Sequence, residues 1–246
     1  MFTTCKKRLL TASVFLALAT AVAKPPGLGI YEGLVLRFIA GPSSLKLKDS
    51  SGQKNNGRTS SVVVSNSPSL VSMETTHQLT LALWIKPNSI PGEFPVLISK
   101  GGNQQPGAYG GYELILNANG NDDILFESGN YNATTAGSGG TLINSHLGEW
   151  IHVAFTIDTV GQTAQFYVNG QAITNFGAVG TFSDVNFDAP NNLYIGVPDP
   201  AANANRARFD GDMKEIMIFK RSLSAGEIQQ IYSSTKPKTS PLRTAE

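Results

Sequence analysis

Short segments in which apolar and polar residues alternate recur along this chain, with Gly, Pro and Asn between them. In residues 150–157 (WIHVAFTI), every second side chain from Ile151 to Ile157 is apolar, which is typical of a strand with one buried face. The same pattern predicts strands at residues 34–39, 79–87, 95–100, 112–117, 124–128 and 165–168. Short strands at this spacing, separated by turn-forming residues, predict an all-β protein.

Two local signals describe how the C-terminal part is connected. Asn169-Gly170 follows a predicted strand, and both residues tolerate the positive φ angles of a two-residue hairpin turn. Ser224 and Glu227 form a capping-box pattern, in which a hydroxyl and a carboxylate satisfy amides at a helix start. Only a short helix fits before Pro237. The predicted fold class is all-β, a two-sheet antiparallel jelly-roll sandwich with one short C-terminal helix.

The first residues have the pattern of a secretory signal peptide. Three basic residues precede an apolar run that is too short to cross a bilayer, and Ala21-Val22-Ala23 has the small-x-small form of a cleavage site. An uncleaved anchor is the alternative. The expected organisation is a signal peptide (1–23), a Pro- and Gly-rich linker (24–31), one jelly-roll domain (32–233) and a polar, disordered tail (234–246).

Charge and cysteine content narrow the class of partner. Loss of residues 1–23 removes three of the 19 Lys and Arg and none of the 18 Asp and Glu, which leaves a net charge of −2. So nearly neutral a chain offers no basic surface for nucleic acid. The single cysteine, Cys5, leaves with the signal peptide, so the exported domain has no disulfide. We expect a secreted, extracellular protein, or a periplasmic one in a Gram-negative bacterium, with no membrane insertion after cleavage.

A set of segments between residues 32 and 232 forms a specific pattern when its members are taken together. They are DSSGQKNNG, NSPSL, LTLALWIKP, LISKG, GEWIHVAFTID, YVNG, LYIG and MKEIMIFKRSLSAGEI. This set resembles the laminin G-like branch of the concanavalin A-like jelly-roll family. The resemblance implies an extracellular module that binds sugars or proteins. Some enzymes, including glucanases and polysaccharide lyases, use the broader fold, so the resemblance does not choose between binding and catalysis.

Glycoside cleavage requires two carboxylates that flank the scissile bond. The Glu-x-Asp-x-x-Glu motif of the broader fold's glucanases is absent from this chain. If the hairpin of residues 112–128 is centred on Gly120, however, Glu113 lies directly opposite Glu127, with Cβ atoms about 5 Å apart. That separation is compatible with a retaining pair. The alternative is that both residues are solvated acids on an outward face.

The sequence predicts neither a covalent nucleophile nor a metal. The exported chain has no cysteine, no G-x-S-x-G motif and no histidine pair with zinc-ligand spacing. Relatives that hold a structural calcium use an aspartate that opens the last strand, and Lys214 stands at the matching position. An ammonium has no lone pair and cannot ligate a cation, so we expect no calcium and no other cofactor. For Asp49, an Asx turn is favoured over metal binding.

Sugars are recognised by an aromatic ring against their C–H face and by amides or charged groups at their hydroxyls. Two loops that flank the same hairpin, residues 101–112 and 129–144, supply these side chains. The candidate ligand-binding residues are Asn103, Gln105, Tyr109, Tyr131 and, if its loop folds toward the same edge, Arg206. Ordinary loop composition is the alternative. Trp84 and Trp150 lie on alternating strands and are expected in the core.

These observations predict a secreted, non-catalytic module that recognises an extracellular glycan or glycoprotein through loops at one end of the sandwich. Two alternatives stay open. One is a glycan-cleaving enzyme that uses Glu113 and Glu127, which requires the carboxylates to lie about 5–10 Å apart in an open groove. The other is an adhesion or structural protein that contacts a protein partner through a sheet face.

Overall fold

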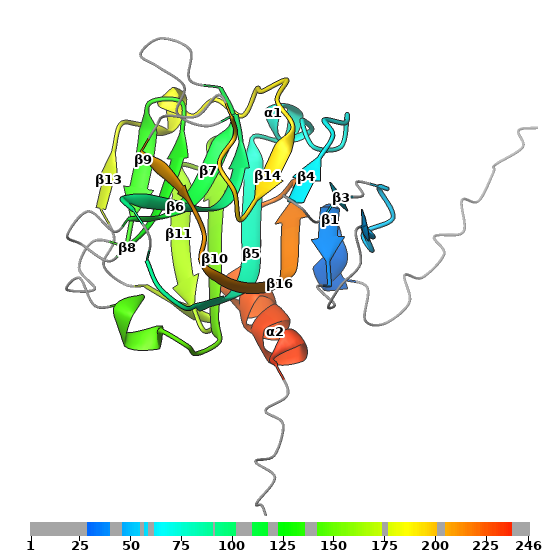
Figure 1. Ribbon diagram of the computed structural model, residues 1–246. Coiled ribbons are helices and arrows are strands. Elements are labelled where there is room, and N and C mark those ends of the chain that lie inside the picture. Colours follow the sequence, from blue (N-terminus) through cyan, green and yellow to red (C-terminus); the bar gives the residue numbers. More distant parts are fainter. Residues whose placement is uncertain are drawn as a thin grey trace, which may run out of the picture.

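Two packed β-sheets with a helix outside one of them make up the molecule (Figure 1). The computed structural model describes residues 29–39, 46–54, 57–58, 62–90, 92–101, 110–117, 123–135, 142–173, 177–200 and 205–237. The predicted fold class, an all-β two-sheet sandwich with one short C-terminal helix, is confirmed.

The first sheet contains six strands in the order β1-β16-β5-β10-β11-β12. Their bounds are Leu34–Phe38 (β1), Gly211–Phe219 (β16), Gln78–Pro87 (β5), Ile151–Asp158 (β10), Thr163–Val168 (β11) and Gln171–Ala172 (β12). All of these neighbours pair antiparallel. The predicted hairpin turn is confirmed, since Asn169 and Gly170 join β11 to β12 with φ angles of 49° and 78°.

The second sheet contains ten strands, with the order β13-β9-β8-β7-β6-β14-β4-β3-β2 and with β15 parallel to β6. Their bounds are Gly177–Val179 (β13), Tyr131–Thr134 (β9), Asp123–Ser128 (β8), Tyr112–Asn117 (β7), Phe94–Lys100 (β6), Leu193–Ile195 (β14), Val62–Val64 (β4), Gly57–Arg58 (β3), Lys46–Leu47 (β2) and Arg206–Arg208 (β15). Strands β9 and β15 lie in segments that the sequence predicts as loops. Each of them contains one of the predicted ligand-binding residues, Tyr131 in β9 and Arg206 in β15.

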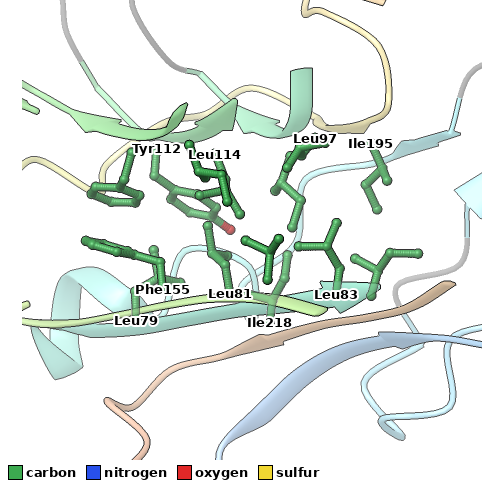
Figure 2. Packing of buried hydrophobic residues seen from close by; sticks show 14 of the residues in the cluster. Leu79, Leu81, Leu83, Leu97, Tyr112, Leu114, Phe155, Ile195 and Ile218 are labelled. Atoms are coloured by element: carbon green, nitrogen blue, oxygen red, sulfur yellow. The ribbon is translucent and has the colours of Figure 1, made fainter. Parts of the chain in front are cut away.

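Alternate side chains of the central strands meet between the two sheets, as Figure 2 shows. The labelled residues come from β5, β10 and β16 on one side and from β6, β7 and β14 on the other: Leu79, Leu81, Leu83, Phe155, Ile218, Leu97, Tyr112, Leu114 and Ile195. Across this layer the rings of Phe126 and Phe155 stack with centroids 4.2 Å apart. Removal of this apolar surface from water is the main stabilising contribution to the fold.

Helix α2 (Ala225–Thr235) covers the outer face of the first sheet. Its Ile228 and Ile231 pack in a second apolar cluster with residues such as Ala154 and Met217. The alternating strand β10 is therefore buried on both faces, whereas its pattern predicts one. The other helical segments are single turns: η1 (Gly29–Tyr31), α1 (Met73–Thr76), η2 (Asn144–His146) and η3 (Phe182–Asp184).

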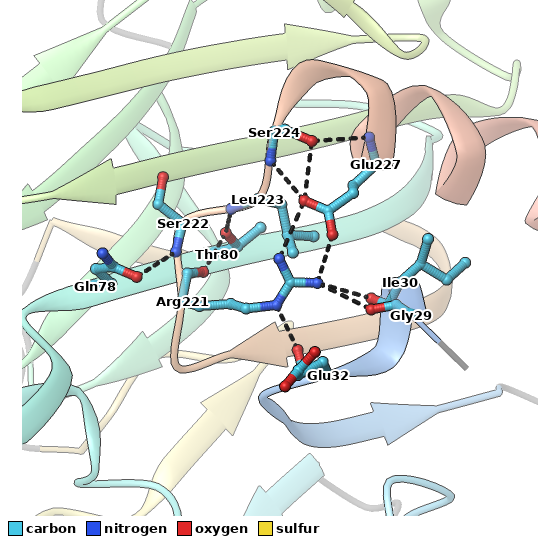
Figure 3. Close-up of polar contacts among 10 residues, drawn as sticks. All are labelled: Gly29, Ile30, Glu32, Gln78, Thr80, Arg221, Ser222, Leu223, Ser224 and Glu227. Atoms are coloured by element: carbon cyan, nitrogen blue, oxygen red, sulfur yellow. Dashed lines mark hydrogen bonds and ion pairs between the residues drawn. The ribbon is translucent and has the colours of Figure 1, made fainter. Parts of the chain in front are cut away.

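Arg221 connects the start of α2 to the N-terminal end of the domain (Figure 3). Its guanidinium binds both carboxylate oxygens of Glu227 at 2.7 and 3.1 Å, and it donates to the carbonyls of Gly29, Ile30 and Glu32. The predicted capping box is confirmed, with Ser224 and Glu227 bonding each other's backbone amides. Hydrogen bonds from Arg221, and then from Ser224, lower the pKa of Glu227 to about 2.

The ends of the domain extend slightly beyond the expected boundaries. Residues 29–31 of the expected linker form η1, in which Ile30 is buried. Helix α2 continues to Thr235, inside the expected tail. The expected signal peptide, the rest of the linker and residues 238–246 lie outside the described residues.

His152 on β10 gives a prediction for the pH dependence of stability. It is 1% exposed, it makes edge contacts with the rings of both Trp84 and Tyr232, and burial lowers its pKa to about 3. Because the unfolded chain binds this proton near pH 6.5, stability is lost as the pH falls from about 6.5 toward 3. Between pH 7 and pH 5 the free energy of unfolding of the unmodified protein should fall by about 2 kcal/mol more than that of His152→Phe. Urea denaturation at each pH measures both values. His146→Phe is the control, and equal pH slopes in His152→Phe and the unmodified protein would show that His152 does not set the slope.

Candidate functional site

The two carboxylates singled out by the sequence lie together on the outer face of the second sheet. Strands β7 and β8 pair with Glu113 directly opposite Glu127. Their neighbours Leu114 and Phe126 are fully buried on the opposite, core-facing side. The hairpin register predicted from the sequence is therefore confirmed.

Arg206 of β15 lies between the two carboxylates. Its Nε donates to Glu113 Oε2 at 2.9 Å, and its Nη2 donates to Glu127 Oε2. Ser99 Oγ donates to the other oxygen of Glu113 at 2.7 Å. The guanidinium carbon also lies 5.0 Å from the centroid of the Phe94 ring. A single cation thus offsets the repulsion between two opposed acids.

This arrangement does not meet the condition for glycoside cleavage. The side chain of Glu113 is fully buried, and those of Arg206 and Glu127 are 2% and 10% exposed. A retaining pair must flank a substrate in an open groove, whereas these carboxylates are held by Arg206. The catalytic alternative is therefore unsupported. The sequence predicts Arg206 as a loop residue that faces a ligand. This prediction is wrong, because Arg206 is the buried partner of the two acids.

The other predicted ligand-binding residues divide into two groups. Asn103, Gln105 and Tyr109 lie outside the described residues. Tyr131 is corrected from a loop residue to a core residue, because it begins β9 and is 2% exposed. Its ring stacks on Phe182 with centroids 5.4 Å apart. A ring packed in this way offers no surface to a ligand.

Lys100 organises the end of the sandwich from which the 102–109 loop departs. This lysine is fully buried, and its Nζ donates to Asn66 Oδ1, Ala189 O and Asn191 O at 2.8–2.9 Å. Burial lowers its pKa to about 8. Gly101 and Gly110 lie in contact, since a Cβ on Gly101 would be 2.3 Å from the Gly110 carbonyl oxygen. The two ends of the loop are thus fixed against the turn that Lys100 holds.

The sequence reasoning missed Lys100, although the signal was present. Lys100 has the same parity along β6 as Ile98, which faces the core. A lysine at a core-facing position near a strand end indicates a buried ammonium that needs carbonyl acceptors.

Asp49 forms the predicted Asx turn. Its Oδ1 accepts from the amides of Arg37 and Ser51, both at 2.9 Å, and its Oδ2 accepts from Ser51 Oγ at 2.7 Å. Within the described part of the chain, no group of three or more His, Cys, Asp or Glu side chains is placed to hold a metal ion. The expectation of no calcium stays a prediction.

The two tryptophans occupy different environments. Trp84 is 2% exposed, and its Nε1 donates to Thr235 Oγ1 at 2.9 Å, so it is buried beneath α2. Trp150 is only half-buried, and the Nζ of Lys214 lies 4.3 Å from its ring centroid. The expected core position is thus wrong for Trp150, which precedes β10 at the margin of the sheet.

Comparison with solved structures identifies the same architecture in larger proteins. The binding domain of Paraclostridial Mosquitocidal Protein 1 matches with a TM-score of 0.58 and 17% identity, over 83% of this chain and 53% of that one. Trypanosoma rangeli sialidase, in complex with 2,3-difluorosialic acid, matches with a TM-score of 0.55 and 16% identity, over 83% and 33%. Botulinum neurotoxin type C, whose cell entry depends on interaction with two ganglioside molecules, matches with a TM-score of 0.57 and 14% identity, over 83% and 52%. At these identities the likeness shows the fold alone.

Sequence comparison is more limited. No curated protein matches the chain. None of the helices in the described ranges has both the length and the apolarity to cross a membrane. A family model described as the concanavalin A-like lectin/glucanases superfamily matches residues 56–229. Since this match covers most of the two-sheet sandwich and more than half of the sequence, the chain belongs to the laminin G family of the concanavalin A-like lectin/glucanases superfamily.

Proposed function

We propose that this protein is a secreted, non-catalytic module that binds carbohydrate. The observation that carries the proposal is the ion bridge made by Arg206. On the scaffold of a lectin and glucanase superfamily, the opposed pair Glu113 and Glu127 is buried and bound to a cation. The function that we assign to this scaffold is recognition by loops presented on rigid sheets.

Three further observations support carbohydrate as the ligand class. Proteins of similar fold include one whose cell entry depends on gangliosides and one that is a sialidase. The end of the sandwich organised by Lys100 exposes the polar residues Asn186, Asp188 and Asn192. The segment that follows Gly101 in sequence contains Asn103, Gln105 and Tyr109, which have the side chains that sugar recognition uses.

A glycan array tests the proposal. The purified protein should bind a defined set of glycans equally well with and without EDTA, and it should release no reducing sugar from any bound glycan. Tyr109→Ala should lose binding, whereas Gln53→Ala, which changes an exposed side chain in another loop, should keep it. Release of reducing sugar would support the enzyme alternative. Silence across the array would reject the proposal and direct the search to protein partners.

Secretion has its own test. Expression of the full chain in a secreting host should yield a mature protein whose N-terminal sequence begins at Lys24, as the Ala21-Val22-Ala23 site predicts. Retention of residues 1–23 on a membrane-associated product would favour the uncleaved anchor.

A further inference from the structure

Two lysines lie over aromatic rings where α2 ends on the outer face of the first sheet. The Nζ of Lys214 is 4.3 Å from the ring centroid of Trp150, and the Nζ of Lys236 is 5.7 Å from that of Tyr232. Lys236 is exposed, and the other three residues are half-buried. All four therefore present part of their surface to solvent.

Strand register places these residues beside one another. Lys214 of β16 pairs with Trp84 of β5, and Trp84 pairs with His152 of β10. Trp150 precedes His152 by two residues, so it lies about 7 Å along the same face. Tyr232 of α2 stacks on Trp84 with ring centroids 5.4 Å apart. Trp150, Lys214, Tyr232 and Lys236 thus form one surface, which we call the lysine–aromatic patch.

Neither ammonium group of the patch is bound by an acidic side chain of the described residues. Among the described residues, neither Lys214 nor Lys236 takes part in a hydrogen bond or an ion pair. The carboxylate next in sequence, Glu215, is bound by Arg37 at 2.9 Å. Partial burial lowers the pKa of Lys214, and the charge of Glu215 opposes that shift. A partly desolvated cation without a direct ion-pair partner attracts an anionic group more strongly than a fully hydrated lysine does.

One pair of opposite charges lies beside the patch on this face. Asp212 of β16 lies directly opposite Lys86 of β5 in the strand register. The patch itself contains two cations and no acidic residue. Two cations are too few for a nucleic-acid surface, which needs an array of phosphate contacts. They suit a small ligand that carries one or two negative groups and has an apolar face for the ring.

We propose that the lysine–aromatic patch binds a carboxylate-bearing sugar, such as a sialic or uronic acid residue of a glycan. The sugar carboxylate pairs with Lys214 Nζ, and the C–H face of the sugar lies against the exposed part of the Trp150 ring. Lys236 receives a second negative group of a longer glycan. This inference rests on the proposed carbohydrate-binding function and specifies a ligand class and a surface for it. The patch lies on the first sheet, whereas Gly101 and Gly110, which flank residues 102–109 in sequence, adjoin strands β6 and β7 of the second sheet.

Tryptophan fluorescence gives a local readout of this site. The chain has two tryptophans, and Trp84 is 2% exposed, so acrylamide quenching reports mainly on Trp150. The probes are 3′-sialyllactose and an oligogalacturonate, with lactose and the methyl-esterified oligogalacturonate as neutral counterparts. We expect the acidic sugars to protect Trp150 from acrylamide and to bind at least about tenfold more tightly than the neutral sugars. Their affinity should fall with added NaCl.

Matched variants assign the effect to the patch. Lys214→Gln should weaken binding of the acidic sugars about tenfold, the loss expected for one charge-assisted contact. Lys214→Arg should retain most of the affinity. Lys220→Gln, which changes an exposed lysine just beyond β16, should leave it unchanged. A thermal melt of each variant confirms that it is folded before binding is measured.

The outcomes separate failure of this inference from failure of the proposed function. Glycan binding that is insensitive to Lys214→Gln but lost in Tyr109→Ala would overturn the patch and keep the carbohydrate-binding function. Absence of binding to every sugar would overturn both. Binding to anionic phospholipid vesicles without binding to either acidic sugar would overturn both and identify a lipid surface as the partner.

Discussion

Arg206→Met should lower the free energy of unfolding by about 4 kcal/mol, because it leaves two buried carboxylates opposed without a cation. Arg206 is the residue that bridges Glu113 and Glu127, and the side chain of Glu113 is fully buried. Removal of one partner from a buried charge network costs more than the intact network contributes, since the remaining charges stay desolvated. Urea denaturation at pH 7 measures the loss.

Two variants isolate the electrostatic cause. Arg208→Met changes the exposed arginine of the same short strand and should cost less than about 0.5 kcal/mol. Arg206→Met combined with Glu113→Gln and Glu127→Gln removes all three charges and should recover more than half of the lost stability. An effect of Arg206→Met no larger than that of Arg208→Met would show that the bridge does not stabilise the fold. Failure of the triple variant to recover would assign the loss to packing against Phe94.

Lys100→Met should cost about 3 kcal/mol, because it removes the donor shared by three oxygen acceptors. Methionine has nearly the shape of the lysine stem but cannot donate to Asn66, Ala189 and Asn191. Two of these acceptors are backbone carbonyls in the turn that fixes the ends of the 102–109 loop. Amide hydrogen exchange in residues 186–192 should therefore accelerate together with the loss measured by urea denaturation.

Lys220→Met is the control for Lys100→Met, since Lys220 is exposed and its loss should leave both measurements unchanged. The variant also bears on function. If the Lys100→Met variant remains folded, a glycan that is recognised by residues 102–109 should bind to this variant more weakly than to the unmodified protein. If the stability and the rate of amide exchange do not change, the turn at residues 186–192 keeps its conformation without the Lys100 ammonium.

The strands of the sandwich could be predicted from the sequence where apolar and polar residues alternate over six or more positions. Residues 79–87 and 150–157 have this pattern, and the hairpin register of Glu113 and Glu127 followed from the parity of their apolar neighbours. Local periodicity is a reliable signal because it reports which side chains face one sheet surface. The capping box was equally local, since its two partners are three residues apart.

The candidate site was harder to predict from the sequence, because contacts between residues far apart in the chain form it. Arg206 lies 93 and 79 residues from its two carboxylate partners, and β15 is only three residues long. No local pattern indicates which distant acids such a segment will reach. Tyr131 was misplaced for a related reason: Gly129 and Asn130 indicate a loop, but stacking on Phe182 buries the ring. Tertiary packing overrode composition at both positions.

Arg221 has a mechanical consequence for any longer polypeptide that contains this domain. Through Arg221, the segment at Gly29 and Ile30 is bound beside the first turn of α2. The helix has 11 residues, so its last residue lies about 16 Å from the turn beside which this segment is bound. Tension applied to both ends would therefore act first on the Arg221 contacts that link these two segments.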